Sequence, residues 1–290
     1  MKNTVIIGYG QLGTELCQQL IQHDQHVTTV SRSQHACLSS HHDHQIADLD
    51  SAAVVIRLPP DIDTLYYFAP PADTDLSDQR LRTLLAYLQA HRVAHIIYIS
   101  TSGVYGDCKG ALVTETAALR PATARAKRRL DAEHQLQQFN TLTATAVTIL
   151  RCAAIYSAKT INRQRIIANS KPVIRADSAP YTNRIHLDDL VAVCLCAGQK
   201  PAKTLEIYNV SDGHASTTTE HAWLLSDLTG QQRNKQISMQ EAEHYYSPAY
   251  LSYLHESKRL DITKLKRQLQ PAFKFENINK GILHCLKQAG

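Results

Sequence analysis

Apolar runs alternate with helical patterns through the first half of the chain. The apolar runs predict strands at residues 4–7, 27–30, 64–68, 94–100 and 144–150. Between them, the pattern predicts helices at residues 11–22, 77–91 and 122–139. Strands that alternate with helices pair in parallel and carry helices on both faces of the sheet. The pattern therefore predicts a doubly wound α/β sheet, the Rossmann fold.

The second half of the chain has a less regular pattern. It predicts helices at residues 187–197, 217–228 and 278–287, and one strand at Leu205–Val210. We expect a Rossmann core at residues 1–155, completed by a returning segment at 183–212. The rest of the chain, residues 156–182 and 213–290, is expected to form a small C-terminal lobe that binds a substrate.

One polar stretch interrupts the first half of the chain, at residues 39–44 (SSHHDH). Its three histidines could hold a metal ion, but the spacing places no further ligand beside them. A solvated loop is the simpler interpretation, and we predict no metal site.

Composition is that of an ordinary globular protein. The 290 residues are 43% hydrophobic and 20% charged, and a net charge of +5 is too small to indicate nucleic acid binding. Seven scattered cysteines without a CxxC pair indicate free thiols in a reducing compartment. No apolar run approaches the ~20 residues that span a bilayer, and the N-terminus has no signal-peptide pattern. We therefore expect a cytoplasmic protein with neither a membrane nor a nucleic acid partner.

A glycine pattern follows the first predicted strand. Gly8, Gly10 and Gly13 form G-x-G-x-x-G at the turn into the first helix. In such a turn the first glycine allows the tight bend, the second lets a pyrophosphate approach the backbone, and the third allows close helix–strand packing. The helix begins at Gln11 and Leu12, where free N–H groups and a positive dipole would face the phosphates. The pattern predicts a dinucleotide-binding turn, the alternative being a glycine-rich turn without a ligand.

The end of the second strand indicates which dinucleotide binds. Proteins that prefer NAD usually carry an acidic residue there to bind the ribose 2′-hydroxyl, whereas this chain reads Ser31-Arg32-Ser33. A guanidinium pairs well with a 2′-phosphate, so the sequence favours NADP, with NAD as the other option. A solvated surface arginine is the alternative interpretation of Arg32.

Several further segments resemble extended short-chain dehydrogenases, the group that contains nucleotide-sugar epimerases and dehydratases. They lie in the family's order along the chain, at residues 99–106 (ISTSGVYG), 150–156 (LRCAAIY), 183–190 (NRIHLDDL), 208–212 (YNVSD) and 257–269 (SKRLDITKLKRQL). The resemblance implies a nicotinamide cofactor and an oxidoreductase, epimerase or dehydratase activity.

The resemblance also implies roles for individual residues. Thr101 falls on the family's catalytic Ser/Thr, and Asp48 on an acid that contacts the adenine. The remaining cofactor-lining positions are Ala69, Pro70, Pro71, Ser100 and Cys152. A loop carboxylate at Asp48 and a rigid turn at the two prolines are the alternative interpretations.

The chain departs from the family at the catalytic helix. The family's Tyr and Lys, spaced Y-x-x-x-K, lie on one helical face, where the lysine lowers the tyrosine pKa. One alignment frame puts Arg125 and Arg129 at these positions, and a shifted frame puts Thr123 and Lys127 there. Neither frame contains a tyrosine, and an arginine stays protonated near neutral pH. The ordinary mechanism is therefore in doubt, although Arg129 could hold the nicotinamide ribose or a substrate anion.

The second lobe identifies no substrate. We interpret Tyr245, Tyr246, Tyr250 and Tyr253 as one helix packed by its aromatic face, and His186 as a structural partner of Asp188 and Asp189.

Two functions remain open: an NAD(P)-dependent enzyme acting on a small polar, sugar-like molecule, and a non-catalytic NAD(P)-binding sensor. The charged helix at residues 122–139 is poorly suited to a dimer interface, which predicts a monomer or a weak dimer.

Overall fold

The computed structural model describes residues 2–51, 54–168, 171–200 and 204–288. Its centre is a parallel seven-stranded sheet in the order β3-β2-β1-β5-β7-β9-β14. The strands are β1 (Asn3–Ile7), β2 (His26–Ser31), β3 (His42–Ile46), β5 (Thr64–Tyr67), β7 (His95–Thr101), β9 (Ala146–Cys152) and β14 (Leu205–Val210). The predicted doubly wound α/β fold is confirmed.

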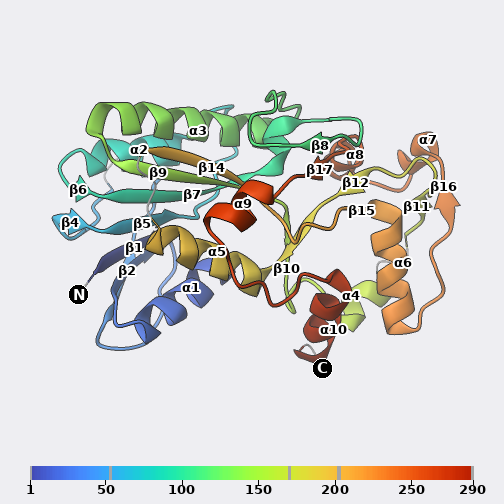
Figure 1. The fold of residues 1–290 in the computed structure, drawn as a ribbon, viewed down its shortest axis with the longest axis horizontal. Helices are drawn as coiled ribbons and strands as arrows, with labels where there is room; N and C mark the ends of the chain where they lie inside the picture. The colour runs from blue at the N-terminus through green and yellow to red at the C-terminus, as the bar shows by residue number, and fades with distance from the viewer. Residues whose placement is uncertain (1, 52–53, 169–170, 201–203, 289–290) are drawn as a thin grey trace.

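Helices cover both faces of the sheet, as Figure 1 shows. One face carries α1 (Gln11–Gln22) and α5 (Leu187–Gln199), and the other carries α2 (Gln79–Leu88) and α3 (Ala124–Thr143). Because side chains alternate across a strand, β1 contributes to both cores. Ile6 packs with leucines of α1, whereas Val5 and Ile7 pack with leucines of α2 and α3.

Short elements extend the sheet region. Two-stranded pairs join β4 (Asp61–Ile62) to β6 (Arg92–Val93), and β8 (Leu112–Val113) to β17 (Arg259–Leu260). The 3-10 turn η1 (Ser102–Tyr105) follows β7 directly. The helix α9 (Thr263–Gln268) lies late in the sequence but packs against the sheet region, where its Leu265 is buried in the core that also contains residues of α1 and α5.

A second group of small elements lies beyond the carboxyl ends of the sheet, on the right of Figure 1. Its short strands are β10 (Ala154–Tyr156), β11 (Val173–Ile174), β12 (Tyr181–Thr182), β13 (Arg184–His186), β15 (Ser216–Thr217) and β16 (Gln236–Ile237). Its helices are α4 (Arg163–Ala168), α6 (Thr218–Thr229), α7 (Met239–Ala242), α8 (Pro248–Leu254) and α10 (Ile278–Gln288). We call this group the lobe. No helix in the described part of the chain is long and apolar enough to cross a membrane.

The prediction of a loop at residues 39–44 is wrong for residues 42–44, which belong to a strand. His42 starts β3, which pairs with β2 from Val27↔His42 to Ser31↔Ile46. This strand is at the edge of the sheet and half exposed, so backbone pairing with β2 stabilises it without an apolar sequence.

Candidate functional site

The strand order reverses between β1 and β5, and a cavity of about 270 Å³ lies there at the carboxyl ends of the strands. We call it the glycine-turn cavity. The predicted cofactor residues that line it are Gly8, Gly10, Ser31, Arg32, Ser33, Asp48, Ala69 and Pro70. Doubly wound sheets bind ligands at such a switch point.

The three glycines have the separate roles that their spacing predicts. Gly8 has φ +101, and a Cβ on it would lie 2.6 Å from the backbone nitrogen of Ala69. A Cβ on Gly13 would lie 2.5 Å from the carbonyl oxygen of Gly8, so this glycine permits the close approach of α1 to the turn. A Cβ on Gly10 would meet no described atom within 4 Å. The backbone at Gly10 is therefore open to a ligand, and no described side chain caps the first turn of α1 beside it.

Six predicted cofactor residues are not in the lining of this cavity: Gln11, Leu12, Gly13, Pro71, Ser100 and Cys152. Ser100 and Cys152 line a second cavity, described below. The Gln11 side chain instead donates to the Ser157 hydroxyl at 2.8 Å, which ties the start of α1 to the segment after β10. Leu12 packs against the core.

The sequence interpretation missed Arg80, which lines the glycine-turn cavity from α2. Its guanidinium donates to Asp50 at 2.7 Å and to the Pro70 carbonyl at 2.8 Å. The hydrogen bond and charge of Arg80, and more weakly the charge of Arg32, lower the pKa of Asp50. Arg80 lies far along the chain from the glycine pattern, so no local motif indicates it.

A second cavity, of about 430 Å³, lies at the carboxyl ends of β7 and β9. We call it the Thr101 cavity. Its lining includes Ser100, Thr101, Arg125, Arg129, Cys152, Tyr181, Thr182, Tyr253, Glu256 and Lys258. The predicted catalytic residues therefore lie together, and side chains of the lobe face them. The Thr101 hydroxyl accepts a hydrogen bond from the Gly103 N–H at 3.2 Å.

The structure distinguishes the two alignment frames of α3. Thr123 is the N-cap of this helix and accepts from the Ala126 N–H at 3.1 Å, and Lys127 is exposed. Arg125 and Arg129 line the Thr101 cavity instead. The Arg129 guanidinium donates to the Tyr98 hydroxyl at 3.1 Å and to the Ile99 carbonyl at 2.9 Å, so β7 holds it in place.

A buried polar network lies beneath the Thr101 cavity. Glu133, which is fully buried, accepts from the Ser100 hydroxyl at 2.6 Å and from Arg151 at 2.7 Å. Arg151 also donates to the Tyr105 hydroxyl at 3.0 Å, which in turn donates to Asn209 at 2.7 Å. The network joins α3, η1 and the ends of β7, β9 and β14, and the Ser100 hydroxyl is committed to it. Near it, burial raises the pKa of the Cys152 thiol to about 12.

Tyr253 of α8, and Glu256 and Lys258 on the segment after it, also line this cavity, to which the sequence interpretation did not assign them. Lys258 is 5% exposed, and its ammonium lies 2.7 Å from a Glu256 carboxylate oxygen. The Tyr253 hydroxyl is hydrogen-bonded to the Thr182 hydroxyl. Tyr253, Glu256 and Lys258 lie more than a hundred positions after Thr101 and are brought to it only by the tertiary fold.

Residues 4–211 match the NAD dependent epimerase/dehydratase family. The chain belongs to this family. It is 26% identical over 227 residues to Protein YeeZ of Escherichia coli (strain K12), which covers 72% of this chain and 77% of that protein. A functionally unknown conserved protein from Silicibacter pomeroyi DSS has a TM-score of 0.84 at 22% identity, covering 100% of this chain and 99% of its own. UDP-glucuronic acid 4-epimerase from Bacillus cereus, in complex with NAD, has a TM-score of 0.76 at 18% identity. The match covers 99% of this chain and 98% of the epimerase chain. At these identities the solved structures show a shared fold.

A third cavity, the lobe cavity, has about 1020 Å³ and is lined by α6, α8 and neighbouring loops. The interpretation of the four tyrosines as one packed helix is wrong, because α8 begins only at Pro248 and Tyr245 is 45% exposed. The rings of Tyr246 and Tyr250 stack with their centroids 4.6 Å apart and line the lobe cavity. Tyr253 lines the Thr101 cavity instead. The helix α8 thus contributes to both cavities of this epimerase/dehydratase family member.

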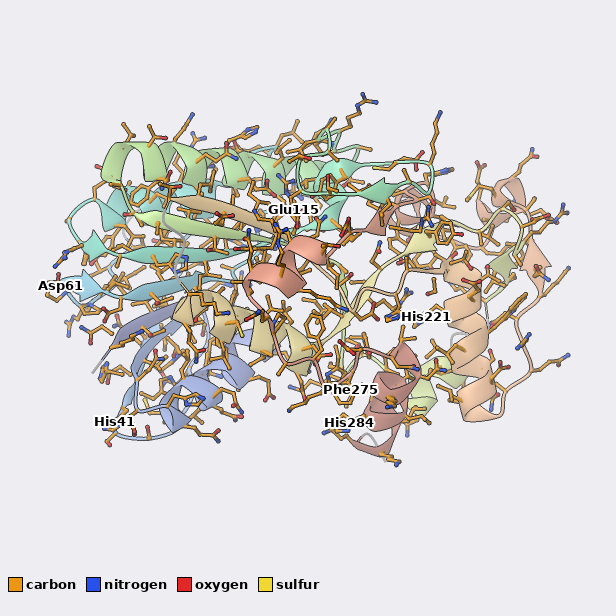
Figure 2. All side chains as sticks on the ribbon, viewed as in Figure 1. His41, Asp61, Glu115, His221, Phe275 and His284 are labelled. Atoms are coloured by element: carbon orange, nitrogen blue, oxygen red, sulfur yellow. The ribbon has the colours of Figure 1, made fainter. Side chains whose placement is uncertain are left out.

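His186 has a structural place in the fold. Its Nδ1 accepts from the Asp188 N–H at 3.1 Å and so caps α5, and burial lowers its pKa to about 4. The ring packs on Phe275 and on His284 of α10, which are labelled close to each other in Figure 2. Asp189 accepts hydrogen bonds from two backbone N–H groups, those of Lys274 and Phe275. The prediction that Asp189 is a partner of His186 is therefore wrong, whereas Asp188 is its partner.

Proposed function

We propose that the protein binds a nicotinamide dinucleotide, NADP(H) in preference to NAD(H), and transfers hydride to or from a small polar, sugar-like compound. The open backbone at Gly10, beside the uncapped first turn of α1, is the observation that carries this proposal. The Bacillus cereus 4-epimerase, which has a similar fold and is described in complex with NAD, supports it. Oxidoreductase and epimerase/dehydratase chemistries both need this cofactor.

The preference for NADP(H) rests on charge at the end of β2. Arg32 and Arg80 both line the glycine-turn cavity, and Asp50 pairs with Arg80. Arg32 is exposed and makes no ion pair among the described residues, so its guanidinium is free to bind a 2′-phosphate. Asp48 lines the same cavity and would face the adenosine.

Proton transfer must use other groups than the family's tyrosine. When bound, the nicotinamide supplies or accepts hydride. The Thr101 hydroxyl would hold the substrate oxygen, and Tyr253 is the proton donor that we propose, because it lines the same cavity. Arg125 and Arg129 stay protonated and would bind a substrate anion or the cofactor ribose.

A non-catalytic NAD(P)-binding sensor is the second candidate, favoured by the missing tyrosine and by the commitment of Arg129 to β7. A titration with NADPH, followed by a cofactor-consumption screen against sugars, aldehydes and ketones, separates the two. An enzyme should turn over at least one compound and lose this activity in Tyr253→Phe, with NADPH affinity unchanged. Tyr181→Phe, in the same cavity, is the matched control. Cofactor binding without turnover of any compound would favour the sensor.

We also propose a monomer or a weak dimer. The outer face of α3 exposes Lys127, whose desolvation in a two-fold interface would be costly. Arg128 is buried, donating to the Asp75 carbonyl at 2.9 Å, and is unsuitable as a probe of the surface. Light scattering at micromolar concentration should give the monomer mass, and a tight dimer that Lys127→Glu breaks would contradict the proposal.

A further inference from the structure

The polar stretch that starts β3 brings histidines to the glycine-turn cavity. His35 lines this cavity, and its ring centroid lies 5.0 Å from that of Tyr9 and 5.1 Å from that of His44. Tyr9 is the residue between the first two glycines of the turn. The rings therefore connect the turn that faces a pyrophosphate with the loop after β2 that carries Arg32.

Two of these histidines belong to one chain of hydrogen bonds. The Leu38 N–H donates to Nδ1 of His42 at 3.0 Å, and Nε2 of His42 lies 2.8 Å from the Thr29 hydroxyl. The same hydroxyl lies 2.8 Å from Nδ1 of His44, whose Nε2 lies 2.9 Å from the Ser33 carbonyl oxygen. The chain thus runs from a backbone N–H at one end of the loop to a backbone carbonyl at the other.

The backbone groups at the two ends fix where the histidine rings that bind them carry a proton. A backbone N–H only donates, so Nδ1 of His42 carries no proton, and its Nε2–H donates to Thr29. A carbonyl oxygen only accepts, so Nε2 of His44 carries a proton, and its Nδ1 shares a hydrogen bond with the Thr29 hydroxyl, which also lies 3.4 Å from the Asp43 carbonyl oxygen. His42 is then held in one tautomer, with its proton on Nε2. Burial, together with the charges of His44 and His26, lowers the pKa of His42 against the opposing effect of Asp43, in keeping with a neutral ring.

We infer that this chain, Leu38–His42–Thr29–His44–Ser33, is a positioning device that holds Arg32 and His35 for the 2′-phosphate and so sets the preference for NADP(H) over NAD(H). The loop from Ser33 to Leu38 has no helix or strand of its own, so these two attachments replace regular backbone pairing. A loop ordered before binding loses less entropy when the ligand arrives. Since only NADP(H) carries the 2′-phosphate, order at this loop favours it selectively. The inference rests on the proposed cofactor binding.

The test measures the dissociation constants of NADPH and NADH by calorimetry on the full chain. His44→Phe keeps a ring against Tyr9 and His35 but removes both hydrogen bonds, and Thr29→Val removes the central hydroxyl from a fully buried site. Each variant should weaken NADPH binding about tenfold, close to the loss of one charge-assisted contact, and leave NADH binding within about twofold. His44→Gln should recover most of the preference, because its amide offers one acceptor and one donor.

His41→Gln is the matched control. His41 precedes His42 by one residue, its side chain takes no part in these hydrogen bonds, and it lies at the edge of the molecule in Figure 2. Thermal melting checks that each variant is folded. If Thr29→Val does not fold, His44→Phe still tests the inference, because its site is only half-buried. An unchanged ratio of NADPH to NADH affinity in folded His44→Phe, or an equal loss for both cofactors, would overturn the inference. A wild type that binds neither cofactor would refute the proposed function, and this inference with it.

Discussion

The glycine-turn cavity and the Thr101 cavity lie at the carboxyl ends of the same sheet, yet they differ in what builds them. Backbone geometry builds the first, where Gly8 bends the chain and Gly10 leaves it open. Side chains from remote segments build the second, where Arg125 and Arg129 of α3 face Tyr253 and Lys258 of the lobe. The family's cofactor turn is kept, whereas its catalytic tyrosine is absent. If the first cavity binds the cofactor and the second carries the chemistry, as we propose, substitutions at the two cavities should separate binding from turnover.

The largest effect is expected at Gly10. Gly10→Val puts a side chain where the pyrophosphate would approach, so NADPH binding should fall by about a hundredfold or more. Stability should be kept, because a Cβ there meets no described atom within 4 Å. Calorimetry and thermal melting measure the two quantities.

Gly13→Val is the contrasting variant. Its Cβ would lie 2.5 Å from the Gly8 carbonyl, so it should lose both stability and binding. Normal NADPH binding by Gly10→Val would show that the glycine turn is not the cofactor site.

The buried network below the Thr101 cavity should control stability. Arg151→Met leaves Glu133 buried without its ionic partner and should cost about 3–5 kcal/mol of unfolding free energy. Adding Glu133→Leu removes the stranded charge and should restore much of that loss. Urea unfolding of the two variants measures both steps. If Arg151→Met melts like the wild type, the pair does not hold the ends of these strands together.

A smaller effect concerns pH and the sheet itself. His95 in β7 is 1% exposed, and burial lowers its pKa to about 4 from an ordinary value of ~6.5. Below pH ~6.5 the unfolded chain binds a proton that the folded chain does not, so stability is complete above this pH and falls below it. This group should remove about 2 kcal/mol between about pH 7.5 and 5.

The matched variant for this effect is His95→Gln, whose side chain can still reach the Thr148 hydroxyl that His95 contacts at 2.9 Å. Urea unfolding at both pH values should show a smaller pH-dependent loss for the variant. An equal loss in variant and wild type would mean that other histidines carry the effect.

The sequence predicted the parts of the fold that local patterns control. Strands with continuous apolar runs, such as β7 and β9, and the glycine turn were predicted because both depend on neighbouring residues. The edge strand β3 was missed because its pairing with β2, and not its polar sequence, makes it a strand.

Site residues divide in the same way. Thr101 and Arg32 follow predicted strands, so motif spacing found them. Tyr253, Glu256 and Lys258 reach the Thr101 cavity from a lobe of short elements, where no periodic pattern indicates their neighbours. The frame of α3 was ambiguous in the sequence, and the N-cap at Thr123 distinguishes the two alternatives.

One titration tests the central claim, that the glycine-turn cavity binds NADP(H) through its backbone turn and Arg32. Calorimetry of the wild type with NADPH and with NADH should give one site per chain, with NADPH bound more tightly. Arg32→Ala should remove about 1.5–3 kcal/mol from NADPH binding and leave NADH binding nearly unchanged. Absence of binding for both cofactors, or equal affinities that Arg32→Ala does not alter, would contradict the claim.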